Sequence, residues 1–473
     1  MSLQSDFHKH LIRYVGNPLV LLWTGDYAML REIEKYDEIY VLSRERLLER
    51  QWEKVQQLLR EAYENCPYYT QLFDREGIKP ERIQSPEDFA RIPILTKTDI
   101  RNHGKELLSR KADEKTLLQS GTAGSTDVPL PFWRTKETVR EKWAQTSSLD
   151  RWYDWGIGNK TAYLWGSPRD LYTPKSVKAK IRRFLETQDI MLLARPLSKE
   201  ILENYRRKLL RYSPEFIQAY PQSLYLLATH IASVQGQRAE GTGPGRLFPE
   251  LKAIISTAEP LYDFQREKLE KVFSCDVYDR YGARETGLVA TECPQAHAMH
   301  INTEGVYLEV VEKGKFAGED KIGEVIVTDL LNTAMPFIRY QIKDVGSLSP
   351  GVCKCGCEPP LMKSITGRTG DVVVLPDGRF FAGITFTISL IKDSPGTKQL
   401  QVIQEELTKF TIKYVPTEDF TEHDLIALRK NFHDILGEGL DLSLERVDEI
   451  PRDPSGKTRF CISKVKLDLL EKQ

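Results

Sequence analysis

The sequence predicts an α/β protein with a large layered N-terminal body and a small α+β domain at the C-terminus. The chain has 473 residues, which is too long for one ordinary core and indicates two or three domains. From about residue 117, short apolar runs alternate with amphipathic stretches, a pattern typical of strands alternating with helices. After about residue 370, three strand patterns accompany one amphipathic helix pattern and indicate a smaller unit.

The first hundred residues are expected to be helical. The clearest helix pattern starts at Leu42 and reads LSRERLLERQWEKVQQLLREAYENC, with apolar residues at helical spacing and good helix formers throughout. Asn65, Cys66 and Pro67 are expected to end it.

The strands of the body are expected where apolar runs are short and bounded by turn residues. These runs are TAYLWG from Thr161, LKAIIST from Leu251, DVYDRYG from Asp276 and EVIVTDL from Glu324. In the C-terminal unit, QLQVIQ, KFTIKYV and LSLERV are expected to be strands. EHDLIALRKNFHDILG is expected to be a helix that Gly437 ends.

The net charge and the distribution of apolar residues limit the kinds of partner and location that we expect. Net charge is −1, which does not favour a nucleic-acid or membrane surface as partner. No apolar run approaches about 18 residues, so no membrane span is expected. The start of the chain lacks a signal-peptide pattern, and we expect a cytoplasmic protein. The oligomeric state stays open, with a homodimer as one alternative.

The stretch SGTAGST is the first candidate ligand-binding motif. Its glycines allow a tight backbone, and its hydroxyls and N–H groups suit a phosphate, although a polar turn explains the pattern equally well. The candidate phosphate-binding residues are Ser120, Gly121, Thr122, Gly124, Ser125 and Thr126.

Two further motifs lie near expected strand ends. In YDRYGARETG, Tyr281 can stack on a base and Glu285 can bind a Mg²⁺ that bridges phosphates. The alternative is a strand end with a solvated Glu. In PFIRYQIKDVG, the carboxylate of Asp344 can accept two ribose hydroxyls, whereas the alternative is a surface turn.

The fourth motif is PRDPSGKTRF, near the C-terminus. Its Pro-Ser-Gly turn presents Lys457 ahead of a last apolar strand. A flexible ammonium can neutralise an α-phosphate during attack by a carboxylate. An exposed turn lysine without a catalytic role is the alternative.

Taken in order, these motifs resemble the adenylate-forming superfamily, and specifically its phenylacetate–CoA ligase-like branch. The resemblance runs from about residue 55 to 470. It begins with ENCPYYTQLFDREGIKPERIQSPEDFARIPILTKTDIR and continues through SGTAGST, AYPQSLYLLA, ISTAEPL, YGARE, RYQIKDVG, ITGRTGD and SGK. It implies an acyl-adenylate synthetase-like fold with a body over residues 1–366 and a lid domain over 367–473. The body would include a helical N-terminal segment of about residues 1–110.

The resemblance also implies a role for each matching residue. Adenine would be lined by Ser256, Thr257, Ala258 and Glu259, and bordered by Tyr281 and Gly282. Glu285 would be the Mg²⁺ ligand, Asp344 would bind the ribose of ATP or AMP, and Arg368 would contact the nucleotide. Lys457 would promote adenylation, and Asp371 would lie at the hinge before the lid.

The activity implied is activation of a small carboxylic acid by ATP and Mg²⁺ as an acyl-AMP, followed by transfer to CoA. The chain lacks the R-G-x-N that aryl-CoA ligases of this branch carry shortly after the hinge. Its GRFF at Gly378 looks more like the capsular-polysaccharide-biosynthesis subgroup. An amine or a sugar is therefore the alternative acceptor. A non-catalytic nucleotide sensor is disfavoured because Glu285, Asp344 and Lys457 are all retained.

Four of the seven cysteines fall within 65 positions, which in a reducing compartment indicates a metal rather than disulfides. A zinc knuckle is expected over about residues 290–360, and the branch often carries one. Two thiolates of a C-x-C pair with a Cys and a His from a second loop would form a closed structural Zn²⁺ site. The expected ligands are Cys293, His300, Cys353 and Cys355, with His297 and Cys357 as competing candidates.

Overall fold

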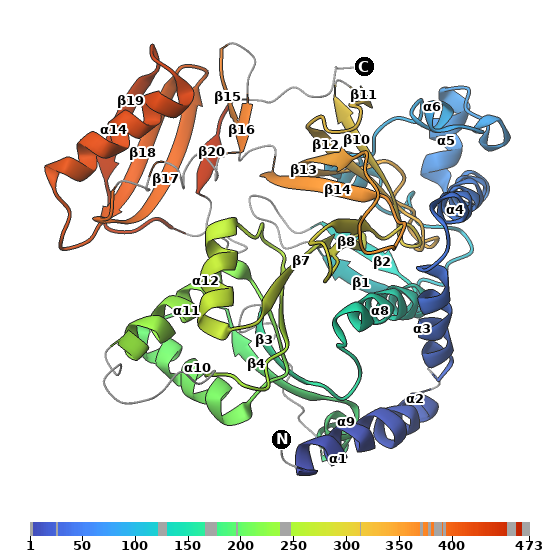
Figure 1. Ribbon diagram of the computed structural model, residues 1–473. Helices are drawn as coiled ribbons and strands as arrows, with labels where there is room; N and C mark the ends of the chain where they lie inside the picture. Colours follow the sequence, from blue (N-terminus) through green and yellow to red (C-terminus); the bar gives the residue numbers. More distant parts are fainter. Residues whose placement is uncertain are drawn as a thin grey trace.

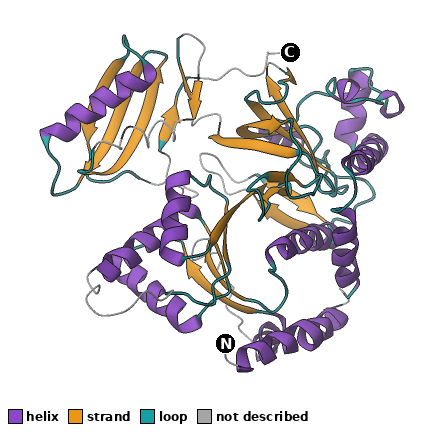
Figure 2. Ribbon diagram, in the orientation of Figure 1, coloured by secondary structure: helices purple, strands orange, loops and turns teal. Residues whose placement is uncertain are grey.

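The structure is a computed structural model that combines N-terminal helices, a large mixed sheet and a separate small sheet (Figure 1; Figure 2). It describes residues 3–24, 27–121, 130–165, 177–194, 197–236, 247–312, 314–368, 372–376, 380–382, 390, 394–451 and 460–465. The predicted α/β class is confirmed. Within these residues, no helix is both long and apolar enough to cross a membrane.

The N-terminal segment is helical, as predicted. Its elements are α1 (Leu3–Leu11), η1 (Ile12–Gly16), α2 (Asn17–Thr24), α3 (Ala28–Ile39), α4 (Arg44–Asn65), α5 (Pro67–Arg75), η2 (Pro80–Arg82), α6 (Pro86–Phe89) and α7 (Lys97–His103). Helix α4 is the helix expected from Leu42. Ser43 caps it by accepting a hydrogen bond from the Arg46 amide, and Pro67 starts the next helix.

The large sheet has a parallel half and an antiparallel half joined at β7 (Asp276–Ala283). The parallel half consists of β4 (Gln188–Leu193), β3 (Lys160–Trp165), β5 (Phe216–Ala219) and β6 (Ala253–Thr257). The helices that join or flank these strands are α8 (Lys136–Asp150), η3 (Arg151–Tyr153), α9 (Val177–Glu186), α10 (Lys199–Tyr212), α11 (Pro221–Gly236) and α12 (Asp263–Phe273). Strands β3, β6 and β7 confirm three of the predicted strands.

The antiparallel half continues from β7 to the far edge of the sheet. In spatial order its strands are β8 (Gly287–Glu292), β9 (Met299–Ile301), β14 (Leu361–Arg368), β13 (Tyr340–Ser349), β12 (Gly323–Asp329), β10 (Val306–Glu312) and β11 (Lys315–Phe316). Strand β12 confirms the fourth predicted strand and is buried along its whole length. A separate hairpin is formed by β1 (Leu118–Gly121) and β2 (Pro131–Arg134).

The C-terminal unit has its own sheet and core. Its strands lie in the order β19 (Asp441–Arg446), β18 (Lys409–Pro416), β17 (Thr397–Glu406) and β20 (Cys461–Ser463). Helix α14 (Glu422–Leu436) covers one face, as Figure 1 shows, and a hairpin of β15 (Val372–Val374) and β16 (Phe380–Ala382) adjoins the sheet. These elements match the predicted strands and helix. Strand β14 runs through the position expected for the domain boundary, which itself stays a prediction.

A buried arginine joins the N-terminal helices to the large sheet. The Arg339 side chain is 2% exposed, pairs with Glu309 at 3.0 Å and donates to the carbonyls of Ala90 and Ile92. The Leu95 amide donates to the Arg339 carbonyl at 3.0 Å. Because a buried charge is costly without partners, these contacts fix the chain before α7 against the start of β13.

We expect Arg339→Met to lower the free energy of unfolding by about 3–5 kcal/mol, because it leaves Glu309 buried without its cation. Lys409→Met is the matched control. It breaks an exposed pair with Glu406 and should cost less than about 1 kcal/mol. Denaturant unfolding followed by circular dichroism measures both, and equal losses would contradict the role of Arg339.

Candidate functional site

The end of β6 supplies the first part of the site. Ser256 and Thr257 are buried, and Ala258 follows with a left-handed φ of 69° that turns the chain. The register pairs Thr257 with Arg280, so Tyr281 lies one residue beyond the end of the β6–β7 pairing. The residues expected around adenine therefore lie at the carboxyl end of a central parallel strand. α/β proteins commonly bind ligands at these strand ends.

Tyr281 connects this end of the parallel strands to the antiparallel half of the sheet. Its hydroxyl donates to the Asp344 carboxylate at 2.7 Å, and the β13–β14 register places Asp344 opposite Arg368. Asp344 lies inside β13, so the alternative of a surface turn is wrong. The structure thus brings together three residues expected to contact the nucleotide. Nothing is described of the Arg368 side chain itself.

Glu285 lies in the tight turn between β7 and β8. It is 6% exposed, so the alternative of a solvated Glu is wrong, and its carboxylate accepts a hydrogen bond from the Tyr340 hydroxyl at 3.1 Å. A Cβ on Gly282 would lie 2.6 Å from the Gly287 carbonyl oxygen, so this turn requires glycine there. Within the described part of the chain, Glu285 forms no ion pair. A buried carboxylate of this kind can serve as a ligand for Mg²⁺.

Lys142 of α8 contacts the same turn. Its ammonium donates to the Glu285 carbonyl at 3.3 Å and pairs with Asp329 at 2.6 Å. The Gly287 φ of 81° lets the backbone pass close to this side chain. Lys142 was not among the candidates found from the sequence, because no local motif distinguishes a lysine in an amphipathic helix.

Only the start of the expected phosphate loop is described. Ser120 and Gly121 lie at the end of β1, and the Ser120 hydroxyl accepts a hydrogen bond from Arg134 at 3.4 Å. The remaining loop candidates and two residues of the lid segment lie outside the described residues. These are Thr122, Gly124, Ser125, Thr126, Asp371 and Lys457.

Four cysteine and histidine side chains converge between two loops of the body. The ligand atoms of Cys293, His300, Cys353 and Cys355 all lie within 4.8 Å of one another. The Cys293 and Cys353 sulfurs are 3.5 Å apart, and the Cys355 sulfur is 3.4 Å from His300 Nε2. Burial lowers the pKa of His300 to about 4, so its ring is neutral near pH 7, the form that binds a metal. This arrangement suits a closed four-coordinate site.

The competing ligand candidates lie outside this group. The His297 ring stacks on Tyr278 and contacts Arg266 and Glu292. The Cys357 amide donates to the Cys355 sulfur at 3.3 Å, so Cys357 contributes its backbone there. All seven cysteines are free thiols.

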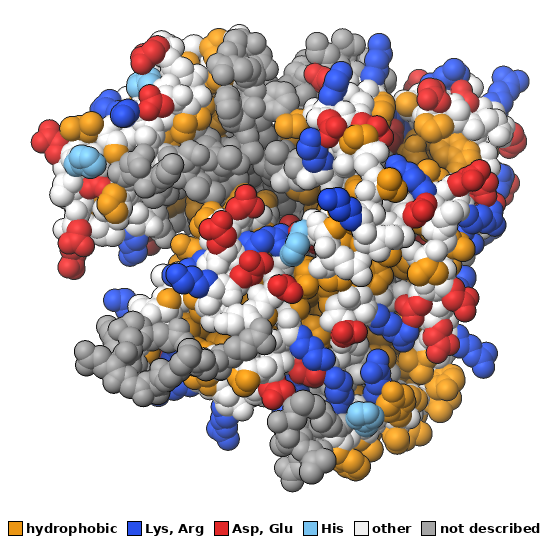
Figure 3. Space-filling view, in the orientation of Figure 1, with side chains coloured by type: hydrophobic (Ala, Val, Ile, Leu, Met, Phe, Trp, Pro, Cys, Tyr) orange, Lys and Arg blue, Asp and Glu red, His pale blue; other side chains and the backbone are white. Residues whose placement is uncertain are grey.

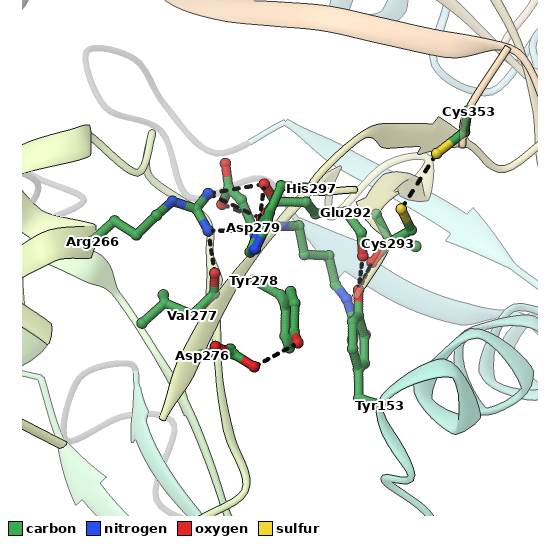
Figure 4. A network of polar contacts seen from close by, with 12 residues as sticks. Tyr153, Arg266, Asp276, Val277, Tyr278, Asp279, Glu292, Cys293, His297 and Cys353 are labelled. Carbon is green, nitrogen blue, oxygen red and sulfur yellow. Dashed lines mark hydrogen bonds and ion pairs between the residues drawn. The ribbon is translucent and has the colours of Figure 1, made fainter. Parts of the chain in front are cut away.

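A polar network that sequence reasoning missed lies beside Cys293 and Cys353 and joins residues of α12, β7 and β8 (Figure 4). Arg266 of α12 donates to both carboxylate oxygens of Glu292 at 3.0 Å. Glu292 also accepts from the Asp279 amide at 2.6 Å, and Cys293 follows it directly in the chain. Burial and the negative charge of Glu292 raise the pKa of Asp279 to about 7. The register pairs Asp279 with Ser256, so the network lies against the expected adenine segment.

Comparisons with known proteins agree with this geometry. The family model of the CapK C-terminal domain matches residues 378–464. Protein CapK of Staphylococcus aureus is 24% identical over 89% of this chain and 90% of its own length. The phenylacetate–coenzyme A ligase of Thermus thermophilus is 25% identical over 89% of this chain and 97% of its own length. The crystal structure of a 2-hydroxyisobutyryl-CoA ligase in the postadenylation state, with R3-HIB-AMP, has a TM-score of 0.68 at 18% identity, covering 88% of this chain and 89% of that one.

Together the fold and these relatives define the chain as an enzyme of the adenylate-forming class, an AMP-forming acid ligase. The resemblance predicted from the sequence is confirmed. Within the class, the chain is similar to phenylacetate–coenzyme A ligases and to Protein CapK, and its C-terminal region matches the CapK C-terminal domain.

The raised pKa of Asp279 predicts a pH-dependent stability. The unfolded carboxyl titrates near 3.8 and the folded one near 7, so this favourable contribution is complete below about pH 4 and is lost as the pH rises through 7. Asp279→Asn cannot ionise. Its free energy of unfolding should therefore rise relative to the unmodified protein between pH 5 and pH 8. Urea unfolding at each pH measures the difference, and a difference independent of pH would contradict the prediction.

Proposed function

We propose that the chain uses ATP and Mg²⁺ to convert a carboxylic acid into an acyl-AMP, with release of pyrophosphate, and then transfers the acyl group to CoA. The observation that carries this proposal is the 2.7 Å hydrogen bond between Tyr281 and Asp344. It holds the expected base-stacking ring beside the expected ribose acceptor. An ionised carboxylate has about four acceptor positions, so Asp344 retains capacity for ribose hydroxyls after accepting from Tyr281.

The chemistry requires two anions to meet. A substrate carboxylate oxygen attacks the α-phosphorus in line, and the bond from that phosphorus to the pyrophosphate oxygen breaks. Glu285 would hold Mg²⁺, which supplies positive charge to the phosphates when it is bound. Lys457 would bring its ammonium to the α-phosphate from the lid domain, so that the developing charge is neutralised in the transition state.

Apart from charge neutralisation, the protein would contribute to catalysis by positioning the nucleotide. The ends of β6 and β7 would orient the adenosine through residues 256–259 and Tyr281. The expected loop at Ser120 and Gly121 would bind the β- and γ-phosphates through hydroxyl and N–H groups. Because Ser120, Tyr281 and Asp344 belong to strands of the body, the nucleotide would be held on rigid elements.

CoA is the acceptor that the relatives favour. Both the Thermus thermophilus relative and the solved structural neighbour carry CoA ligase in their names. In the second step the CoA sulfur would attack the acyl carbonyl carbon, and AMP would leave with the electron pair of the carbon–oxygen bond. An amine or a sugar acceptor is the alternative that the experiment has to separate.

The test is acid-dependent exchange of pyrophosphate into ATP over a panel of aryl and aliphatic acids. We expect exchange with at least one acid, and Lys457→Ala should lower it by about 10²–10³-fold while ATP binding is retained. Lys464→Ala is the matched control, since Lys464 is an exposed lysine of the same domain paired with Glu405. Adding CoA and detecting a thioester by mass spectrometry then identifies the acceptor.

Three results would each contradict a part of this proposal. A folded protein that shows no exchange with any acid removes the adenylation proposal. Exchange without thioester formation, together with transfer of the acyl group to an amine or sugar, would show that CoA is not the acyl acceptor. A loss of ATP binding in Lys457→Ala equal to the loss of exchange would contradict the catalytic role of that lysine.

We also propose that Cys293, His300, Cys353 and Cys355 hold one structural zinc ion. Support comes from the chemistry of the donors, three thiols and one neutral imidazole, and from the amide of Cys355, which donates to the Cys353 sulfur at 3.5 Å. Amide donors of this kind stabilise a thiolate. Thiolate ligands and free cysteines fit a reducing compartment, which supports a cytoplasmic location.

We expect elemental analysis to return about one zinc per chain, and chelation to lower the melting temperature, because the metal cross-links two loops. Cys355→Ser should lose the metal. Cys357→Ser is the control that separates the competing ligand, and it should keep zinc because its sulfur lies outside the four-atom group. Retention of zinc by Cys355→Ser would contradict this assignment.

A further inference from the structure

Arg134 is a half-buried arginine beside the start of the expected phosphate loop. It is the last residue of β2, and the other strand of this hairpin ends with Ser120 and Gly121. On the face of the molecule shown in Figure 3, basic and acidic side chains are interspersed among the residues drawn in colour, without a broad basic patch. The positive charge that a triphosphate requires is therefore expected from single side chains at the site itself.

The hairpin directs the Arg134 side chain toward its loop end. The register pairs Ser120 with Phe132, two residues before Arg134. Alternate residues of a strand share one face, so all three side chains lie on the same face of the hairpin. The Arg134 guanidinium lies 5.5 Å from the centre of the Phe132 ring and donates to the Ser120 hydroxyl at 3.4 Å. Both partners are nearer the loop than Arg134 itself, so the guanidinium extends toward the segment where phosphates are expected.

The positive charge of Arg134 is only partly compensated within the described part of the chain. Arg134 forms no ion pair there, and its Nε is buried without a hydrogen-bond partner. Burial lowers the pKa of Arg134, and the negative charge of Asp329 opposes this only in part. Asp329 itself pairs with Lys142 at 2.6 Å, so its carboxylate is shared with a second cation. A buried donor on a charged group is costly unless it finds an acceptor, and an anion can supply one.

The expected phosphate loop contains no cation of its own. The sequence from Ser120 to Leu130 has no Lys or Arg and one acidic residue, Asp127. Hydroxyl and N–H groups can orient phosphates, but they do not balance the negative charge of two phosphate groups. A guanidinium can supply that charge, because it stays protonated and its fork of N–H groups matches phosphate oxygens. Arg134 follows this segment directly in the chain and in the fold.

The surroundings of Arg134 also adjoin the turn that carries the expected Mg²⁺ ligand. The Lys142 ammonium, which pairs with Asp329, donates as well to the Glu285 carbonyl at 3.3 Å. Asp329 thus connects Arg134 with the turn of Glu285, and Ser120 connects it with the expected loop. Arg134 therefore neighbours both segments that are expected to bind the metal and the phosphates.

The backbone on each side of Arg134 is held in place. The Asn332 amide group donates to the Trp133 carbonyl at 2.9 Å. Thr135 caps α8 by accepting a hydrogen bond from the Thr138 amide at 3.1 Å. A side chain on a fixed backbone loses less freedom when it binds a ligand, so this position is suited to recognition.

We propose that the Arg134 guanidinium binds the β- and γ-phosphates of ATP and the pyrophosphate that adenylation releases. This inference rests on the proposed function, because it assigns a further residue to the same nucleotide site. The alternative is a structural arginine that only fixes the hairpin through Phe132 and Ser120. The two roles differ in their effect on AMP, which has neither a β- nor a γ-phosphate. A residue that binds those phosphates affects ATP and pyrophosphate and leaves AMP unaffected.

The experiment is isothermal titration calorimetry of the full chain with ATP, AMP and inorganic pyrophosphate in the presence of Mg²⁺. We expect Arg134→Gln to weaken the binding of ATP and of pyrophosphate by about 10–100-fold, because hydrogen bonds from a charged group are lost. The affinity for AMP should be unchanged. Arg134→Lys keeps the charge without the fork of donors, so its losses should be smaller but of the same kind.

Arg140→Gln is the matched control, because Arg140 is a partly buried arginine of α8 that pairs with Glu32 at 3.6 Å. It should bind all three ligands like the unmodified protein. Circular dichroism and the melting temperature check the fold, and if Arg134→Gln does not fold, the same comparison in Arg134→Lys decides. Equal losses for ATP and AMP, or no loss for ATP and pyrophosphate, would overturn the role of Arg134 alone. An unmodified protein that binds neither ATP nor AMP would instead overturn the proposed function and this inference with it.

Discussion

The buried guanidinium of Arg339, which pairs with Glu309 and donates to the carbonyls of Ala90 and Ile92, links the large sheet to the N-terminal segment. The position of residues expected to contact the nucleotide depends on this link. Arg339 takes a left-handed backbone angle, φ 50°, which a residue with a Cβ adopts only when its surroundings compensate. Its guanidinium and carbonyl bind the chain around Leu95 from both sides. Strand β13 begins at the next residue and carries Asp344, so the position of Asp344 follows from this contact.

The predictions from sequence succeeded where the signal was periodic and local. Helix α4 and strands β6, β7 and β12 were predicted because apolar spacing alone specifies them. The burial of Arg339 and Glu285 could not be predicted in the same way. A charged residue inside an apolar stretch looks exposed until partners from distant segments, such as Glu309 and Tyr340, are known. The antiparallel half of the sheet was likewise hidden, since strand order is a long-range property.

The cysteine cluster was also predicted in part from local patterns, and the rest depended on long-range contacts. Residue types and crowding predicted a metal site, but the choice among Cys357, His297 and the other candidates required distances. The structure also relates the cluster to the expected nucleotide site. Cys293 follows β8, whereas Cys353 and Cys355 lie between β13 and β14, the strands that carry Asp344 and Arg368. A bond network from Glu292 to Asp279 extends from the cluster to β7. A metal at the cluster would therefore link the loops that position both sides of the site.

Helix α4 makes its anchoring contacts with residues far along the chain. Arg50 pairs with Glu304, 254 positions later, and Gln51 donates to the Val306 carbonyl, 255 positions later. At roughly 5–20 residues per second, a ribosome takes about 13–50 s to produce that intervening length. For that time the apolar side of α4, including Val55 and Leu59, has no sheet to cover it. The nascent chain is therefore exposed to aggregation, and a chaperone that shields the first hundred residues would raise the yield of folded enzyme.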